Sequence, residues 1–316
     1  MRRLAIPLLL AMSACGPKAA PDGRVTLVLG DQVGLSEAKV KAADAFRGAR
    51  FAVRWATFAG AAPLFEALNA GAVDTAPAGD TPVIAAAAAK APIRIVAATR
   101  ASGRSVAILV PKGSPIARVS DLRGKQVIVS SARGSIAHYL LLGALREAGV
   151  PPAAVKIGFM LPGDAQAAFA SGRIDAWATF GTYQALAEAD GARVLRDGRG
   201  INSGLSFLTV SEAALADPAK RAAIVDYVRR QRAANAWAAA HPEPYARVFA
   251  RVTRVTLPIA RVVVGRERPT LIAPDAAVMR DLQRVADRFA DEGVLPARVD
   301  VAPLVDATVF AEAARR

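Results

Sequence analysis

Two short polar loops lead directly into helix starts, and they have the clearest chemical use in this chain. Residues 76–82 (APAGDTP) precede one alanine-rich segment, and residues 130–135 (SSARGS) precede another apolar segment. Thr81 and Ser135 are suited to cap these helices, because a hydroxyl accepts hydrogen bonds from early backbone N–H groups. The other first-turn N–H groups have no partner within the helix and carry the positive end of its dipole. Two such starts facing one cleft could hold a small anion, although ordinary capping also explains each loop.

The second loop offers the strongest candidate contacts. Gly134 permits close approach of the backbone to a ligand, and Ser135 can present its hydroxyl while it caps the helix. His138 could reach the same anion, or it could be an ordinary packed histidine. We therefore expect Gly134 and Ser135 to bind the ligand, and we keep His138 and Thr81 as further candidates.

Other candidates rest on weaker arguments. Gln32 follows the first predicted strand, and α/β sheets bind ligands in the crevice beyond the carboxyl ends of their strands. Asp164 lies at another helix start, where a carboxylate more often serves the backbone N–H groups than a ligand. Phe58, Phe180 and Tyr183 could form a wall for an apolar ligand tail, although aromatic residues at such places are as often part of a core.

No pattern in the sequence indicates catalysis. The nucleophile-elbow, phosphate-loop and zinc-protease motifs are absent, and residues 30–34 (GDQVG) have the wrong glycine spacing for a dinucleotide loop. Ser135 and His138 lie close in sequence, but no acid that would orient the histidine is evident. One cysteine and two histidines are too few for a histidine- or cysteine-rich metal site. We expect a binding protein that uses no cofactor and no metal, and not an enzyme.

The chain is strongly basic, with a formal net charge of +14 over 316 residues. Such a balance suits nucleic acid, an anionic membrane surface or a small anionic ligand. Nucleic acid is the weakest of these, because aromatic residues make up only 6% of the chain and no Lys/Arg run with interleaved aromatics occurs. Much of the excess is arginine on alanine-rich helices, which favours a solvated face. The charge is therefore compatible with a small anion but does not require one.

Short β-rich runs alternate with helical segments through most of the chain. Strands are expected at 25–29, 51–55, 93–97, 106–110, 126–129 and 155–160, and helices at 35–46, 63–70, 83–90, 135–148 and 165–170. Such alternation favours α/β sheets with parallel strands. From about Ser211 onward the pattern is mostly helical, and Trp177 lies in a strand-like run that we assign to the core.

The first residues are typical of an export signal. Two arginines precede an apolar run and small residues, and Cys15 follows them directly. Residues 12–15 (MSAC) resemble a bacterial lipobox, whose cysteine is lipidated. We therefore expect a signal peptide at 1–14, a lipid anchor at Cys15, a flexible tether over 15–24 and a periplasmic, membrane-anchored protein. The alternative is a plain secretory signal with an incidental cysteine. The run is too short to span a bilayer, which needs about 20 apolar residues.

Nine segments of the chain are similar, in order, to motifs of substrate-binding proteins from sulfonate-type ABC importers. They lie at 64–74, 79–82, 91–93, 107–116, 121–125, 133–142, 162–169, 172–177 and 191–198. The resemblance implies a periplasmic-binding-protein fold of the second type, α/β in class, with two lobes that are each a mixed sheet flanked by helices. It places lobe I at 25–105 and 211–316, including a helical C-terminal portion, and lobe II at 106–210. The chain would cross between the lobes near 105–110 and 206–210.

The same resemblance implies a function. It indicates a monomeric extracytoplasmic binding protein that delivers a small organic anion to the permease and ATPase subunits of an ABC importer, with cleft closure around the ligand. An aliphatic sulfonate is the first expectation. Taurine, nitrate and a thiamine-precursor-like molecule are alternatives, as is a two-lobed sensor protein. Asp80 matches the family's Gly-Asp pair. Because a carboxylate repels an anion, we expect Asp80 to hold a loop or to bind an amine end of the ligand.

Three segments differ from the family's usual pattern. The chain has FGTY at 180–183 where the family often carries WDPY, and GSI at 134–136 where the family carries GSS. A common Gly-Pro is replaced by AAP at 61–63. All three segments are expected to line or border the cleft. The resemblance therefore specifies the class of transporter better than it specifies the ligand.

Overall fold

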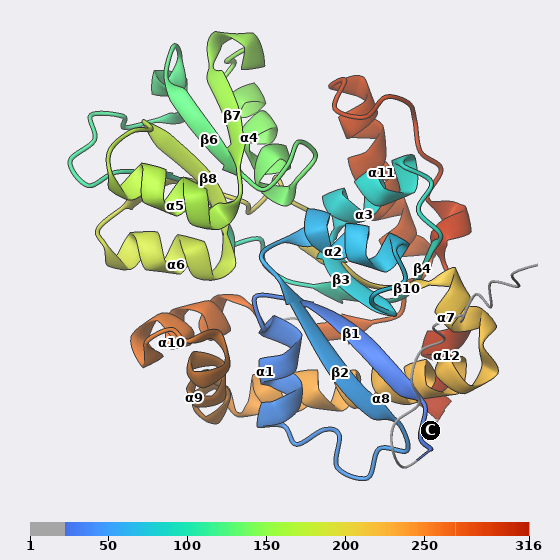
Figure 1. The fold of residues 1–316 in the computed structure, drawn as a ribbon. Helices are drawn as coiled ribbons and strands as arrows, with labels where there is room; N and C mark the ends of the chain where they lie inside the picture. The colour runs from blue at the N-terminus through green and yellow to red at the C-terminus, as the bar shows by residue number, and fades with distance from the viewer. Residues whose placement is uncertain (1–22, 269, 316) are drawn as a thin grey trace, which may run out of the picture.

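The computed structural model describes residues 23–268 and 270–315 and shows two α/β lobes (Figure 1). The predicted signal peptide at 1–14, the anchor Cys15 and most of the tether at 15–24 lie outside the described residues. Within the described ranges no helix is long and apolar enough to cross a membrane.

The larger lobe contains a six-stranded sheet. Its strand order is β11 (Thr270–Ile272), β4 (Ile93–Arg100), β10 (Leu205–Ser211), β3 (Thr75–Gly79), β1 (Thr26–Gln32) and β2 (Ala52–Phe58). β1 pairs in parallel with β2 and β3, whereas β10 runs antiparallel to both β3 and β4. The sheet is therefore mixed, as the family resemblance implied, and not wholly parallel.

The smaller lobe contains a five-stranded mixed sheet. Its order is β7 (Lys156–Met160), β6 (Gln126–Ser130), β8 (Ala176–Phe180), β5 (Val106–Val110) and β9 (Arg193–Asp197). β5 is buried along its whole length, as its continuous apolar sequence predicts for a strand covered on both faces. Trp177 on β8 is fully buried, and its indole Nε1 donates a hydrogen bond of 2.8 Å to Ser130 Oγ, which confirms its assignment to the core.

The helices occur largely where the sequence pattern places them. In the N-terminal two thirds they are α1 (Leu35–Ala42), α2 (Ala61–Asn69), α3 (Asp80–Ala88), α4 (Ile136–Glu147), α5 (Pro162–Ala170) and α6 (Gly181–Ala189). The C-terminal part is mostly helical, as predicted, with α7 (Glu212–Ala216), α8 (Pro218–Ala240), α9 (Pro242–Thr253), α10 (Leu257–Arg266), α11 (Ala276–Asp291) and α12 (Ala307–Arg315). The short strand β11 interrupts this helical region.

The chain passes between the two sheets at β4–β5 and again at β9–β10. The second passage corrects the sequence analysis, which placed it at 206–210 and ended lobe II at residue 210. Those residues belong to β10, which lies between β3 and β4 in the six-stranded sheet. β10 is almost entirely buried, so its apolar run is a central strand of the larger lobe, and the connection is the preceding segment 198–204.

One apolar core cluster contains residues of both lobes. It includes Leu64 of α2, Ile108 of β5, Leu140 of α4 and Phe289 of α11. The ring of Phe289 lies 5.2 Å from the ring of Tyr139 on α4, measured between centroids. α11 also contacts α3. The lobes are therefore joined by packed side chains as well as by the two connections, and the site described next lies between them.

Candidate ligand-binding cavity

A cavity of about 400 Å³ lies between the lobes, in the size range of small-molecule sites. The larger lobe contributes the end of β1, the start of α2 and the end of β3. The smaller lobe contributes the loop between β6 and α4 and the start of α6. The three segments that differ from the family pattern all contribute residues to its lining, namely 61–62, 134–136 and 180–183. The position of the cavity thus agrees with the cleft that the resemblance implied.

Much of the cavity wall is apolar. Its larger side chains include Val33, Leu35, Phe65, Val106, Phe180 and Leu208. Burial of an alkyl chain against such a wall is favourable by roughly 0.8 kcal/mol for each methylene group. The wall therefore suits a ligand with an aliphatic portion.

Helix starts supply polar groups to the same cavity. In the described part of the chain, no side chain caps α2, which follows Gly60, or α6, which follows Phe180. The first-turn N–H groups of α2 consequently have no capping side chain, whereas the first N–H group of α6, that of Gly181, donates to the Ser105 carbonyl oxygen at 2.7 Å. A Cβ atom built on Gly60 would lie 3.4 Å from Ser131 Oγ, so the start of α2 meets the loop before α4 across the gap between the lobes. This meeting point places backbone N–H donors from both lobes around one space, which suits an anion.

The starts of α1 and α3 are filled by carboxylates of the protein. Asp31 accepts hydrogen bonds from the backbone N–H groups of Ser36 at 3.0 Å and Glu37 at 2.9 Å. Asp80 accepts one from the Thr81 N–H group at 2.7 Å and a short one from the Ser203 hydroxyl. Burial raises the pKa of each carboxyl group to about 6. These two helix starts are therefore not free to bind an external anion.

This arrangement corrects part of the predicted site. Asp80 and Thr81 are buried and do not contribute to the cavity lining. Asp80 instead bonds Ser203 in the connection 198–204, which is the loop-holding role that was one of its two expected roles. A carboxylate of the chain itself thus fills the start of α3, which is one of the two helix starts of the predicted anion clamp.

Gly134 and Ser135 do line the cavity, as predicted. Gly134 has a φ of 81°, a left-handed conformation that favours glycine. The Ser135 hydroxyl donates to the Ser130 carbonyl oxygen at 3.0 Å and accepts from the His138 N–H group at 3.3 Å. Its proton is therefore engaged within the protein. The cap is therefore real. Three N–H groups of the loop are engaged within the protein as well, namely those of Ser131, Gly134 and Ser135.

His138 is a packed histidine and does not line the cavity. It is 4% exposed, and its ring lies edge-on to Phe159 with centroids 5.1 Å apart. Its Nδ1 accepts a hydrogen bond of 3.2 Å from the Gly134 N–H group. Burial, together with the charge of Arg133, lowers the pKa of His138 to about 4, so the ring is neutral near pH 7. It therefore holds the loop and does not supply a positive charge.

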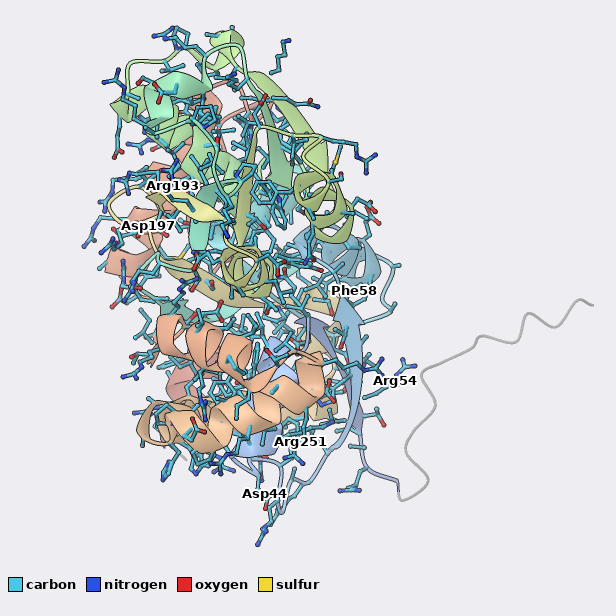
Figure 2. All side chains as sticks on the ribbon, turned by 90° about the vertical axis from the view of Figure 1, so that its left-hand side faces the viewer. Asp44, Arg54, Phe58, Arg193, Asp197 and Arg251 are labelled. Carbon is cyan, nitrogen blue, oxygen red and sulfur yellow. The ribbon has the colours of Figure 1, made fainter. Side chains whose placement is uncertain are left out.

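The remaining candidates divide between the cavity and other parts of the fold. Gln32 and Tyr183 line the cavity, and the Gln32 side chain donates to the Pro77 carbonyl oxygen at 2.7 Å. Phe58, at the end of β2 in Figure 2, packs against the main core cluster and is not among the lining residues. Asp164 lies exposed in the first turn of α5, a helix that packs on β6, β8 and α6, and it too is not among the lining residues.

Several lining residues were not predicted. Ser131 is 9% exposed and adopts a φ of 71°, which is uncommon for a residue with a side chain. Its hydroxyl makes no hydrogen bond within residues 23–268 and 270–315. Lys39 of α1, Asn235 of α8 and Glu267 after α10 also line the cavity. They lie in or directly after three helices, and only the packing of these helices reveals that the side chains point inward.

Comparison with known proteins agrees with this geometry. The family model described as NMT1/THI5 like matches residues 52–243. A protein of Escherichia coli (strain K12) named for binding aliphatic sulfonates is 33% identical over 252 residues, which is 79% of this chain and 77% of that protein. A Bacillus subtilis (strain 168) protein of the same name is 26% identical over 319 residues, covering 98% of this chain and 95% of that protein.

Solved structures give the same picture. The alkanesulfonate-binding protein SsuA from Xanthomonas axonopodis pv. citri, bound to MOPS, has a TM-score of 0.82 at 29% identity and covers 89% of this chain and 98% of its own. The periplasmic aliphatic sulphonate-binding protein SsuA from Escherichia coli has a TM-score of 0.79 at 29% identity, with 91% and 99% covered. The desulfurization enzyme DszB has a TM-score of 0.67 at 18% identity and covers 93% of this chain and 99% of its own, a likeness of fold alone.

Proposed function

This chain belongs to the NMT1/THI5-like family, together with the periplasmic aliphatic sulfonate-binding proteins of ABC transporters, and from this premise we propose that it captures an aliphatic sulfonate for import. The single observation that carries the proposal is the cavity between the lobes. It combines an apolar wall with the start of α2, which no side chain caps in the described part of the chain, and with the loop that leads into α4.

The sulfonate group binds where the start of α2 meets the loop before α4. A sulfonate carries a full negative charge near pH 7 and offers three oxygen acceptors. Backbone N–H groups at the α2 and α4 starts supply donors, and the helix dipoles favour the charge. The free hydroxyl of Ser131 supplies a further donor. No buried arginine is needed to neutralise the ligand.

The aliphatic portion of the ligand lies along the apolar wall. Phe180 and Tyr183 contribute to this wall from the smaller lobe, and Phe65 and Leu208 contribute from the larger one. A chain of several methylene groups would displace water from these side chains and gain roughly 0.8 kcal/mol for each group buried. The proposed ligand is thus an alkanesulfonate rather than a small inorganic anion such as nitrate.

Capture is coupled to closure of the cleft. The proposed ligand contacts both lobes at once, so it stabilises the conformation in which the lobes lie close together. The permease then distinguishes the liganded from the empty protein by its shape. This role requires capture without turnover, and relatives that are 33% and 29% identical to this chain are named as binding proteins.

The location follows from the N-terminal sequence. We propose that residues 1–14 direct export, that Cys15 carries a lipid, and that the tether keeps the binding domain near the membrane, where the local concentration for delivery is high. Replacement of Cys15 by serine is expected to move the protein from the membrane fraction to the soluble periplasmic fraction. Recovery of the variant at the membrane would contradict the anchor.

A thermal-shift panel tests the ligand class. It contains alkanesulfonates, taurine, nitrate, sulfate esters and pyrimidines. We expect the sulfonates of the panel to raise the melting temperature most, and a ligand at a hundred times its Kd stabilises the fold by about 2.7 kcal/mol. A shift with pyrimidines alone would favour the thiamine-precursor alternative, and a shift with nitrate alone would exclude the aliphatic tail.

A further inference from the structure

A second group of polar side chains lies in the cavity apart from the starts of α2 and α4. Lys39 of α1, Asn235 of α8 and Glu267 after α10 all line the main cavity. The same three residues also line a small adjoining cavity of about 10 Å³, which is room for about one water molecule. We refer to Lys39, Asn235 and Glu267 as the polar end of the cavity.

The polar end faces the smaller lobe. A Cβ atom built on Gly181 would lie 3.6 Å from Glu267 Oε1, so the carboxylate lies beside the first turn of α6. The neighbouring Arg266 bonds both carboxylate oxygens of Glu188 on the same helix, one of them at 3.2 Å. This ion pair fixes the end of α10 against α6. Glu267 therefore lies at the boundary between the lobes, and the proposed sulfonate site lies at this boundary too.

The side chains of the polar end lack hydrogen-bond partners in the protein. Within residues 23–268 and 270–315, neither Lys39 Nζ nor the Glu267 carboxylate makes a hydrogen bond or ion pair. Asn235 is 6% exposed, and its Oδ1 atom has no partner there. Thr182, next to Gly181, is 8% exposed, and its hydroxyl is also without one. Because buried polar groups are nearly always hydrogen-bonded, such a cluster indicates a polar guest.

The charges of the polar end favour a guest that donates hydrogen bonds. Glu267 and Asn235 Oδ1 are acceptors, and Lys39 is the one cation among the three. Glu267 and, more weakly, Asp31 lie near enough to influence Lys39 electrostatically, so two carboxylates surround this one cation. Burial lowers the pKa of Lys39 and raises that of Glu267, so removal from water weakens both charges. A second anionic group on the ligand would meet the Glu267 carboxylate and be repelled, whereas an ammonium group would be attracted.

Resting on the proposed function, we propose that the polar end binds a protonated amine at the far end of the ligand, so that the preferred substrates are ω-aminoalkanesulfonates. The sulfonate occupies the starts of α2 and α4, and the methylene chain follows the apolar wall. The ammonium group donates to the Glu267 carboxylate, to Asn235 Oδ1 and to the Thr182 hydroxyl. The ligand then joins the lobes at both of its ends.

Matched pairs of ligands test this inference by isothermal titration calorimetry. The pairs differ only in replacement of a terminal methyl group by an ammonium group: 1-butanesulfonate with 3-aminopropanesulfonate, and 1-pentanesulfonate with 4-aminobutanesulfonate. Because hydrogen bonds to charged groups are the strong ones, we expect the amine of at least one pair to bind about tenfold or more tightly than its methyl partner. Equal binding, or tighter binding of the methyl compound in both pairs, would overturn the inference.

The variant Glu267→Gln removes the charge and keeps the shape. It is expected to bring the affinity ratio within the pair close to one. The control Asp164→Asn removes a carboxylate from the exposed start of α5, outside the cavity lining, and should preserve the ratio. A ratio that Glu267→Gln leaves unchanged would contradict the assignment of Glu267. If no sulfonate of either kind binds, the proposed function itself fails; if methyl compounds bind as well as amines, only the preference for amines fails.

Discussion

At the scale of residues, two serines of one loop differ in what their hydroxyls can still offer a ligand. Ser135 donates to the Ser130 carbonyl oxygen and caps α4 through the His138 N–H group. Ser131 lines the same cavity in a left-handed conformation, with its hydroxyl unbonded within the described ranges. Strained conformations of this kind cluster at binding sites. The Ser131 hydroxyl is therefore the candidate ligand contact, and the Ser135 hydroxyl is a structural cap.

Replacement of each serine by alanine tests this division. Ser131→Ala is expected to weaken alkanesulfonate binding by about tenfold, because a hydrogen bond to a charged group is lost. It should change the free energy of unfolding little. Ser135→Ala is expected to lower the free energy of unfolding by about 1 kcal/mol through loss of the cap, with a smaller effect on affinity. Calorimetry and urea unfolding measure the two quantities, and the reverse pattern would assign the ligand contact to Ser135.

Asp80 makes stability depend on pH. Burial raises its pKa from 3.8 to about 6, so the folded protein holds this proton more tightly than the unfolded chain does. The resulting stabilisation is complete below about pH 3.8 and is lost as the pH rises through about 6. Asp80→Asn removes this titration. Relative to the variant, the wild type should lose up to about 3 kcal/mol between these limits. Urea unfolding across the range measures the difference, and a constant difference would contradict the raised pKa.

The residue scale also shows what sequence can and cannot predict about a site. The loop before α4 was identified because a Gly-Ser pair at a helix start has few roles. The Asp80–Thr81 loop looks equivalent in sequence, yet Asp80 fills the start of its own helix and bonds Ser203, which is distant in the chain. Lys39 of α1, Asn235 of α8 and Glu267 after α10 were not predicted, because helical periodicity does not say which face of a helix meets a cavity.

At the scale of elements, α4 is positioned by close packing on the connection between β9 and β10. A Cβ atom at Gly143 would lie 2.3 Å from Cγ2 of Ile201, a stiff β-branched side chain that is 8% exposed. The absence of a side chain at position 143 thus lets α4, whose start serves the ligand, approach the segment that links the lobes. Asn202 in the same segment donates to the Ile136 carbonyl oxygen at 3.2 Å.

Two glycine-to-alanine substitutions form a matched test of this packing. Gly143→Ala is expected to lower the free energy of unfolding by about 1–3 kcal/mol, because Ile201 has to move. Gly265→Ala, in α10, meets no atom within 4 Å and should stabilise the fold by roughly 0.5–1 kcal/mol through helix propensity. Thermal and urea unfolding measure both. A stabilising Gly143→Ala would show that α4 does not need this close approach.

Elements were predicted well where local pattern determines them. The continuous apolar run of β5 and the helical periodicity of α4 lead to the observed elements. The position of β10 was not predicted, because its sequence is equally compatible with a linking segment and with a central strand. Its pairing partners, β3 and β4, lie more than a hundred residues earlier in the chain. Long-range pairing of this kind leaves little trace in a local pattern.

At the scale of the whole molecule, contacts between side chains hold the two lobes together. Arg266 of α10 and Glu188 of α6 join the lobes, with each side chain about one-fifth exposed. Arg261 and Glu243 form a comparable pair that joins α9 and α10 outside the smaller lobe, with side chains 53% and 40% exposed. The Arg266–Glu188 pair is therefore a contact between the lobes, and the Arg261–Glu243 pair is a control contact within the larger lobe.

If closure accompanies binding, loss of the contact between the lobes should weaken binding. Arg266→Leu is expected to reduce alkanesulfonate affinity by about three- to tenfold, because the closed conformation loses a bidentate ion pair. Arg261→Leu is expected to leave the affinity unchanged. Calorimetric titration of both variants measures the effect. Equal affinities for the two variants would indicate that this contact does not contribute to the liganded conformation.

The central claim is tested most directly by titration of the purified protein with 1-butanesulfonate in a calorimeter, beside the matched cation butylammonium. We expect saturable binding at one site for 1-butanesulfonate or, if its affinity is too low to measure, for its amine-bearing partner 3-aminopropanesulfonate. We expect no binding of butylammonium. Saturable binding of butylammonium, with none for a sulfonate of either kind, would contradict the assignment of the α2 and α4 starts as an anion site.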